Sequence, residues 1–241
     1  MYFDAAAFCG HWPYYYLRDG KLSQVLDMYK QAGIEGGFLS SLDAIFYNDP
    51  WEADGRLIEA LKDTAWRVAM CVNPVLPWAE SLLRQGKAAG VGAVRLYPCV
   101  HGYKENDERA IALCRLAGEL DLPVIVTMRM EDARMVYLLR QEDPDCARIR
   151  SLITQCPETK FVLSNCLVHQ VDEFLPLPEN VWFDTAGFKT EFFLETQQII
   201  SRERILFGSF APLQAVNSAL LSVPKTMKQA IMRQNMKELY K

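Results

Sequence analysis

The chain has 241 residues, half of them apolar, and a formal net charge of −4. This charge argues against a protein that binds nucleic acid or an anionic membrane surface, because phosphate binding needs a concentrated basic face. No apolar run reaches the roughly 18 residues of a membrane span, and the N-terminus has no basic region followed by an apolar core, so we expect neither a membrane segment nor a secretion signal.

Seven cysteines are spread widely along the chain, and no Cys-x-x-Cys pair occurs. An odd number at this spacing suits a reducing compartment better than a disulfide framework. We therefore expect a cytoplasmic protein.

Short apolar runs alternate with stretches of helical period along the whole chain. The first run starts near Phe3 and ends before the segment Gly10-His-Trp-Pro13. Residues 22–29 then have the apolar spacing of an amphipathic helix, and Gly33 follows as a stop signal. Seven further runs are predicted as strands: Gly37–Ser40, Arg67–Val72, Gly92–Tyr97, Pro123–Met128, Lys160–Asn165, Asn180–Thr185 and Arg204–Ser209. Further helices are predicted after Asp49-Pro50, at about 78–89, at about 110–120, up to about 156, and after the last strand at 213–220 and 227–239.

Eight apolar strands, most of them followed by a helix, predict a parallel sheet with both faces buried. Eight such units in series favour the α/β class and a single (β/α)8 barrel over an open doubly wound sheet. No glycine-rich phosphate loop follows any strand, which counts against a dinucleotide fold. No linker or low-complexity tract is present, so we expect one domain over residues 1–241.

In a barrel of this kind the active site lies at the C-terminal ends of the strands. These ends provide a list of polar candidates, which are Cys9, His11 and Trp12; Arg95, Tyr97, Cys99, His101 and Tyr103; Thr127, Arg129, Glu131, Asp132 and Arg134; Asn165, Cys166 and His169; Asp184 and Thr185; and Ser209. Ser209 lacks a Gly-x-Ser-x-Gly elbow, so a serine hydrolase is not expected.

Several motifs along the chain occur in the order found in one barrel family. They are Asp4 to Gly10 followed by His-Trp-Pro, Val94-Arg-Leu-Tyr-Pro98 with His101-Gly-Tyr103, Leu122-Pro123, Glu131-Asp-Ala-Arg134, Val181-Trp-Phe-Asp184, Arg204-Ile-Leu-Phe-Gly-Ser209 with Pro212, and Asn235-Met-Lys-Glu-Leu239. The series resembles the amidohydrolase-2 type of the amidohydrolase superfamily and spans nearly the whole chain. The resemblance implies a barrel with hydrolase or lyase activity, and it allows a homodimer, since such barrels are often dimers.

The same resemblance exposes departures from the family pattern. Metal-using members carry Asp-x-His-x-His on the first strand, and here Ala6 and Phe8 stand at the histidine positions, while Phe210 replaces an aspartate after Gly-Ser. On the fifth strand Val126 and Thr127 stand where a ligand histidine would fall, and the sixth strand has Asn165. Methyl and phenyl groups cannot coordinate a cation, and zinc needs about three protein ligands. The resemblance therefore implies that the family's metal centre is absent, and we expect no cofactor.

A different metal site has to be weighed. Each of the three histidines follows a cysteine closely, and the pairs are Cys9 and His11, Cys99 and His101, and Cys166 and His169. Such soft ligands could in principle hold a metal. We favour the simpler interpretation, because His-Trp-Pro and His-Gly-Tyr are family-like segments whether or not a cysteine precedes them.

The remaining polar residues suggest a small anionic substrate. Arginine binds carboxylates in a bidentate fork, and histidine exchanges protons near neutral pH. We assign catalysis to His11 and His101, and substrate binding to Trp12, Arg95, Tyr97, Arg129, Asp132 and Arg134. Each arginine has a structural alternative, because buried charges are rarely unpaired. Arg95 could pair with Asp132 or Asp184, and Arg134 with Glu131 or Asp132.

Two functions from different classes follow. The first is a metal-independent hydrolase or lyase that acts on a small carboxylate or lactone. The second is a catalytically inactive barrel that binds a metabolite or a partner protein. Three smaller signals remain: Tyr14-Tyr-Tyr16 as a lid, a subunit contact or a packed loop; Phe192-Phe193 as helix packing or an oligomer contact; and Asp184, for which we favour hydrogen bonding to the neighbouring loop over catalysis.

Overall fold

The computed structural model describes residues 1–135, 141–188 and 199–239. In these ranges eight parallel strands form one sheet in chain order, from β1 to β8. The predicted α/β fold is confirmed. The strands are β1 (Tyr2–Cys9), β2 (Ile34–Ser41), β3 (Ala65–Cys71), β4 (Ala93–Leu96), β5 (Val124–Thr127), β6 (Phe161–Ser164), β7 (Val181–Asp184) and β8 (Ile205–Leu206).

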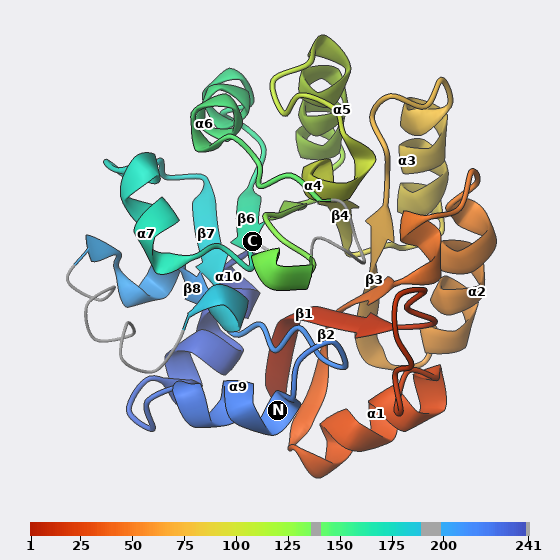
Figure 1. The fold of residues 1–241 in the computed structure, drawn as a ribbon, viewed down its shortest axis with the longest axis vertical. Coiled ribbons are helices and arrows are strands. Elements are labelled where there is room, and N and C mark those ends of the chain that lie inside the picture. Colours follow the sequence, from red (N-terminus) through yellow and green to blue (C-terminus); the bar gives the residue numbers. More distant parts are fainter. Residues whose placement is uncertain (136–140, 189–198, 240–241) are drawn as a thin grey trace.

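Backbone hydrogen bonds close this sheet into a barrel. The N–H of Ala5 donates to the carbonyl of Phe207 at 2.7 Å, and the N–H of Phe210 donates to the carbonyl of Ala6 at 2.9 Å. These bonds join β1 to the residues that follow β8, which completes the predicted single (β/α)8 barrel (Figure 1).

Helices connect the strands and lie around the outside of the barrel (Figure 1). They are α1 (Leu22–Gln31), α2 (Trp51–Leu61), α3 (Ala79–Ala88), α4 (Pro98–His101), α5 (Glu108–Glu119), α6 (Cys146–Gln155), α7 (Val168–Val171), α9 (Val216–Ser222) and α10 (Asn235–Leu239). Short 3-10 turns cover Asp43–Ile45, Ala133–Met135, Asp172–Phe174, Thr185–Gly187 and Arg202–Arg204, and a π-helical turn covers Ala230–Gln234. None of the helices in the described ranges has the length and apolarity needed to cross a membrane. Phe192 and Phe193 lie outside the described residues.

Local chemistry sets where the helices begin. The side chain of Asp107 accepts a hydrogen bond from the N–H of Arg109 at 3.0 Å at the start of α5, and Asp145 accepts from the N–H of Arg148 at 3.1 Å at the start of α6. These bonds satisfy donors that the first turn of a helix leaves unpaired.

The core has a shell between barrel and helices and two clusters inside the barrel. The cluster nearer the N-terminal ends of the strands includes Phe38, Ile125 and Val162, and Met236 and Leu239 of α10 belong to it. The C-terminal helix therefore covers the end of the barrel opposite the expected active site.

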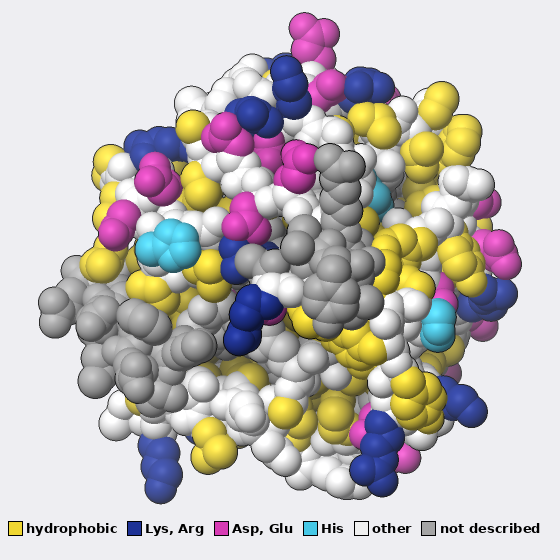
Figure 2. Space-filling model, in the orientation of Figure 1, with side chains coloured by type: hydrophobic (Ala, Val, Ile, Leu, Met, Phe, Trp, Pro, Cys, Tyr) yellow, Lys and Arg dark blue, Asp and Glu magenta, His cyan; other side chains and the backbone are white. Residues whose placement is uncertain are grey.

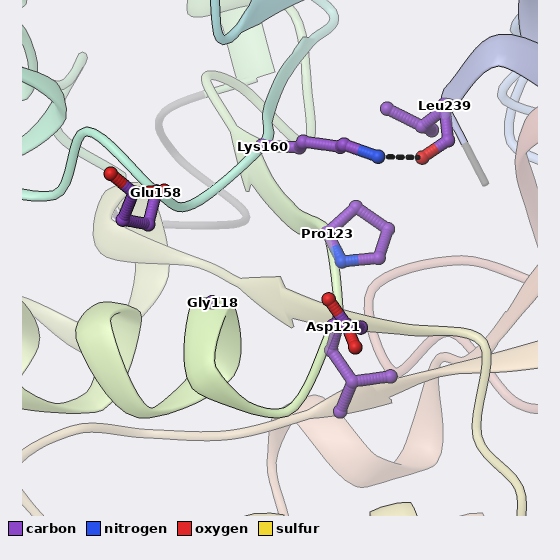
Figure 3. Close-up of a pocket in the computed structure, with 7 residues that line it drawn as sticks. Gly118, Asp121, Pro123, Glu158, Lys160 and Leu239 are labelled. Carbon is purple, nitrogen blue, oxygen red and sulfur yellow. Dashed lines mark hydrogen bonds between the residues drawn. The ribbon is translucent and has the colours of Figure 1, made fainter. Parts of the chain in front are cut away.

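A hollow of about 220 Å³ lies beside this covered end (Figure 3). Pro123 and Lys160, which immediately precede β5 and β6, line it together with Asp121 and Glu158. The Nζ of Lys160 donates to the carbonyl of Leu239 at 3.0 Å, which ties α10 to the start of β6.

Candidate functional site

The barrel interior has a polar wall on β4 to β7. Arg95, Thr127, Ser164 and Asp184 are all 0% exposed. Their chain neighbours belong to the shell between barrel and helices, so these four side chains point inward, because side chains alternate along a strand. The predicted common face of Arg95 and Tyr97 is confirmed. Tyr97 is also 0% exposed and packs inside the barrel, in the apolar cluster that contains Phe8 and Phe210.

Many polar atoms of this wall have no hydrogen-bond partner among the described residues. They are Nε and Nη1 of Arg95, the hydroxyls of Tyr97, Thr127 and Ser164, and Oδ2 of Asp184. Buried polar groups are normally satisfied, and exceptions cluster where a protein has a special requirement. This side of the interior is therefore polar, but several of its polar atoms are not paired by hydrogen bonds.

The opposite wall, on β1 and after β8, is apolar. The rings of Phe8 and Phe210 meet edge to face with centroids 4.8 Å apart and planes 71° apart. Phe210 has a φ of 58°, which a bulky residue rarely adopts. Ala6 and Trp12 complete this side and are buried. The two phenyl rings thus close the interior beneath the mouth of the barrel.

Two buried aspartates hold the strand ends through backbone bonds. Asp184 Oδ1 accepts from the N–H groups of Asn165 and Ala186, both at 3.0 Å, which confirms its expected role in holding the neighbouring loop. Burial raises the pKa of Asp184, and these bonds oppose the rise. Burial also raises the pKa of Asp4 to about 6, against hydrogen bonds from Ser209 and Ala6.

The mouth of the barrel contains a pocket of about 410 Å³ beyond β5, β6 and β7. Arg129, Glu131, Asp132, Asn165 and Thr185 provide its polar lining at the strand ends. The remaining lining comes from Met130, Leu167, Ala186, Gly187 and Phe188 and, after β8, from Leu213, Gln214, Ser218, Ala219 and Ser222. The pocket, which we call the mouth pocket, has the size of a small-molecule site. Its lining is mixed polar and apolar, and apolar and charged side chains are also interspersed over the face of the molecule shown in Figure 2.

Arg129 and the residues that hydrogen-bond to it form one side of the mouth pocket. Arg129, with 15% of its side chain exposed, donates from Nε to Oδ1 of Asp143 at 3.0 Å and from Nη2 to Oδ2 of the same residue. The amide of Asn165 donates to the carbonyl of Arg129 at 2.8 Å. These bonds fix both the guanidinium and its backbone.

A carboxyl with a shifted pKa faces the same pocket. Burial raises the pKa of Glu131, while the neighbouring side chains of Tyr15 and Trp12, on the loop after β1, oppose that rise. Burial and the neighbouring Glu131 raise the pKa of the Tyr15 hydroxyl well above its usual range. Gln141 Oε1 accepts from the N–H of Glu131 at 3.2 Å. Glu131 therefore retains its proton more readily than a free glutamate.

Comparison with known proteins identifies the family. The amidohydrolase family model matches residues 43–240. The chain belongs to the amidohydrolase family. Sequence comparison finds no match among curated proteins.

Solved structures agree with this fold assignment. A dihydroxybenzoic acid decarboxylase from Polaromonas sp. JS666, with bound manganese and the inhibitor 2-nitroresorcinol, has a TM-score of 0.77 and 15% identity over 99% of this chain and 96% of that chain. A 2,6-dihydroxybenzoate decarboxylase from Rhizobium has a TM-score of 0.75 and 15% identity over 99% and 98% of the chains. A putative 2-pyrone-4,6-dicarboxylic acid hydrolase from Pseudomonas putida has a TM-score of 0.70 and 15% identity over 99% and 97%. At such identities the likeness establishes the barrel and not the reaction.

The residues present do not fit the metal of metal-using amidohydrolases. Ala6, Phe8 and Phe210 offer no donor atoms and are buried at 0% exposure. Within residues 1–135, 141–188 and 199–239, no three His, Cys, Asp or Glu side chains form a group that could hold a metal ion. Metal binding requires deprotonated thiols, and burial raises the pKa of Cys9 and of Cys99 to about 12.

The two predicted catalytic histidines lie outside the mouth pocket. His11 is exposed, and its backbone N–H donates to Oδ2 of Asp43 at 3.3 Å. His101 ends α4, where its Nε2 lies 2.9 Å from the carbonyl of Ile45 and burial lowers its pKa. The catalytic roles of His11 and His101 stay predictions.

The predicted binding residues divide into three groups. Arg129 and Asp132 line the mouth pocket, while Arg95, Tyr97 and Trp12 are buried beneath or beside it. Arg134 pairs with Asp132 through two hydrogen bonds of 2.9 and 3.0 Å in an exposed loop, so the structural alternative of pairing within its own loop is present. Tyr14 packs against Trp12 and Phe46, as expected for a packed loop.

Several polar residues of the mouth pocket have no role assigned from the sequence. Glu131, Asn165 and Thr185 are among the candidates because they stand at strand ends. Gln214 and Ser218 follow β8 at a distance along the chain and have no such signal. Their place in the pocket depends on the path of the loop into α9.

Proposed function

We propose that this amidohydrolase is a metal-independent hydrolase or lyase that acts on a small carboxylate or lactone. The observation that carries the proposal is the mouth pocket, where a held guanidinium and a half-buried carboxyl with a raised pKa face the same space. Active sites of (β/α)8 barrels lie at this end of the strands.

Arg129 would bind the carboxylate of the substrate. Asp143 engages its Nε and Nη2 groups, and Nη1 is the donor that we assign to the ligand. Charge-assisted hydrogen bonds of this type orient a substrate as well as bind it. Asn165 and Thr185 supply further polar contacts on the same side.

Glu131 would carry the proton. In the hydrolysis of a lactone, water attacks the carbonyl carbon and the ring carbon–oxygen bond breaks. Protonated Glu131 gives its proton to the departing ring oxygen and takes one from the attacking water, so the residue ends as it began. A raised carboxyl pKa suits a general acid.

The names of similar structures support the substrate class. The two decarboxylases are named for dihydroxybenzoate substrates and the putative hydrolase for a pyrone dicarboxylic acid, all of which are carboxylates. The mouth pocket, with one arginine and several apolar side chains, suits a small unsaturated carboxylate of that kind.

Turnover of a panel of lactones and aromatic carboxylates tests the proposal. Glu131→Gln should lower kcat by about 100-fold or more, the usual contribution of general acid catalysis, and Arg129→Met should mainly raise KM, by about 10- to 100-fold. Glu119→Gln, an exposed change on α5, is the control and should leave both unchanged. Activity retained in both Glu131→Gln and Arg129→Met would contradict the proposal.

The second candidate is an inactive barrel that binds a metabolite or a partner protein. The closure of the interior by Phe8 and Phe210 favours it, since this closure leaves only the outer mouth open to a ligand. Thermal stabilisation by a panel member that is lost in Arg129→Met, without turnover of any compound, would support this candidate over the enzyme.

A further inference from the structure

Arg95 crosses the barrel interior from β4 to β1. Its Nη2 donates to the carbonyl of Ala5 at 3.3 Å, and its Cζ lies 4.6 Å from the centroid of the Phe8 ring. These two contacts flank Ala6 on the strand. The positive charge therefore lies against the stretch of β1 where metal-using relatives would carry their paired histidines.

A second buried group approaches the same stretch of β1. A Cβ built on Gly208 would lie 2.8 Å from Cγ of Asp184 and 3.0 Å from Cβ of Ala6, so these two side chains meet over Gly208. The charge of Arg95 lowers the pKa of Asp184, in opposition to burial. Arg95, Asp184 and Ala6 thus converge on one region of the interior.

The guanidinium has no close counterion in the described part of the chain. None of the ion pairs found there includes Arg95, although the side chain is 0% exposed. An isolated buried charge is costly, so it persists only where something balances it. Asp184 is the buried acid whose pKa the charge of Arg95 lowers, so its carboxylate is the group placed to balance that charge.

We propose that Arg95 is the resident cation of this barrel and occupies the space that a divalent ion occupies in metal-using amidohydrolases. Its stacking on Phe8 stabilises the charge through the face of the ring. An arginine stays protonated at any physiological pH, so this charge is permanent and no chelator removes it. The inference concerns the interior charge and does not depend on the reaction proposed at the mouth.

The test is metal uptake by variants that restore donor atoms. Wild-type protein, Arg95→Met, the triple variant A6H/F8H/F210D and the quadruple variant with Arg95→Met added are each incubated with excess zinc or manganese, desalted and assayed for bound metal. We expect about one equivalent in the quadruple variant alone, because zinc needs about three protein ligands and a space free of competing charge. Circular dichroism of each protein confirms that it is folded.

Three results would overturn the proposal. They are a stoichiometric ion in the wild type, an ion in the triple variant with Arg95 still present, and a folded quadruple variant that takes up none. Because the readout is bound metal, these outcomes are independent of whether any substrate is turned over.

If the quadruple variant does not fold, the thermal stability of simpler variants tests the role of the Arg95 charge. Arg95→Met should lower the midpoint of thermal unfolding by about 5 °C or more, because Asp184 loses its balancing charge. Asp184→Asn in the Arg95→Met background should recover part of this loss, and Arg95→Lys should lose less than Arg95→Met. A single Arg95→Met variant as stable as the wild type would show that no buried acid depends on the charge.

Discussion

Phe8 on β1 and Phe210 after β8 meet edge to face inside the barrel, with ring centroids 4.8 Å apart. Both rings are 0% exposed, and Arg95 stacks on one of them. The pair joins the first strand to the segment that follows the last strand.

Truncation of one ring tests the importance of this contact. Phe210→Ala should lower the free energy of unfolding by about 3–5 kcal/mol, from lost apolar burial and the remaining cavity. Denaturant titration measures the effect. Phe46→Ala, at a ring that is 38% exposed, is the control and should cost clearly less. Equal losses at the two sites would argue against a special role for the interior pair.

Asp54 on α2 provides a pH-dependent stability term. Its Oδ2 accepts from the N–H of Cys71 at 2.8 Å, and burial raises its pKa from 3.8 to about 8. The folded state therefore binds a proton that the unfolded state has lost, so stability falls as pH rises from about 4 to 8, by up to ~1.4 kcal/mol per pH unit. Asp54→Asn should flatten this slope in unfolding experiments at pH 5 to 8. The exposed Asp63→Asn should not, and identical slopes in the wild type and Asp54→Asn would contradict the assignment.

Tyr15 should tune the acid at the mouth. The Tyr15 hydroxyl lowers the pKa of Glu131, so Tyr15→Phe should raise that pKa further. If protonated Glu131 is the active form, the basic limb of the pH–rate profile moves to higher pH in the variant. Tyr16→Phe, at an 87% exposed neighbour, is the matched control. If the basic limb stays at the same pH in Tyr15→Phe, Glu131 is not the group whose titration produces that limb.

Gly187 is required by the close approach of two strand ends. A Cβ at this position would lie 2.1 Å from the carbonyl oxygen of Cys166, a backbone atom that cannot move aside cheaply. Gly187→Ala should cost about 1–3 kcal/mol of stability, as overpacking does, and should weaken ligand binding at the mouth pocket. Gly55→Ala within α2, where the nearest atoms belong to the Trp51 side chain at 3.2 Å, should be close to neutral. Unchanged stability in Gly187→Ala would contradict the local packing described for β6 and β7.

The apolar runs predict the barrel because a strand buried on both faces has almost no polar residues. Two strands differ most from the prediction: β8 covers only Ile205–Leu206 of the predicted Arg204–Ser209, and β2 begins at Ile34 and not at Gly37. At the start of β2, two glycines that are required for a steric reason interrupt the apolar pattern. A Cβ on Gly36 would lie 2.5 Å from the carbonyl oxygen of Ala65, and one on Gly37 would lie 1.9 Å from that of Asp4.

The site was predictable only in part. Period-two spacing correctly places Arg95 and Tyr97 on one face. Arg129 pairs with Asp143, which lies on the far side of a loop, and residue spacing does not predict the path of that loop. His101 lies against the carbonyl of Ile45 because α4 follows β4 directly. Contacts between distant loops decide which candidates reach the mouth pocket.

The most direct measurement is the initial rate of lactone or carboxylate turnover in excess chelator, followed by readdition of zinc or manganese. We expect the same rate with and without chelator, with no gain on readdition, and loss of the rate in Glu131→Gln. A rate that falls to background in chelator and returns with the metal would contradict a metal-independent amidohydrolase.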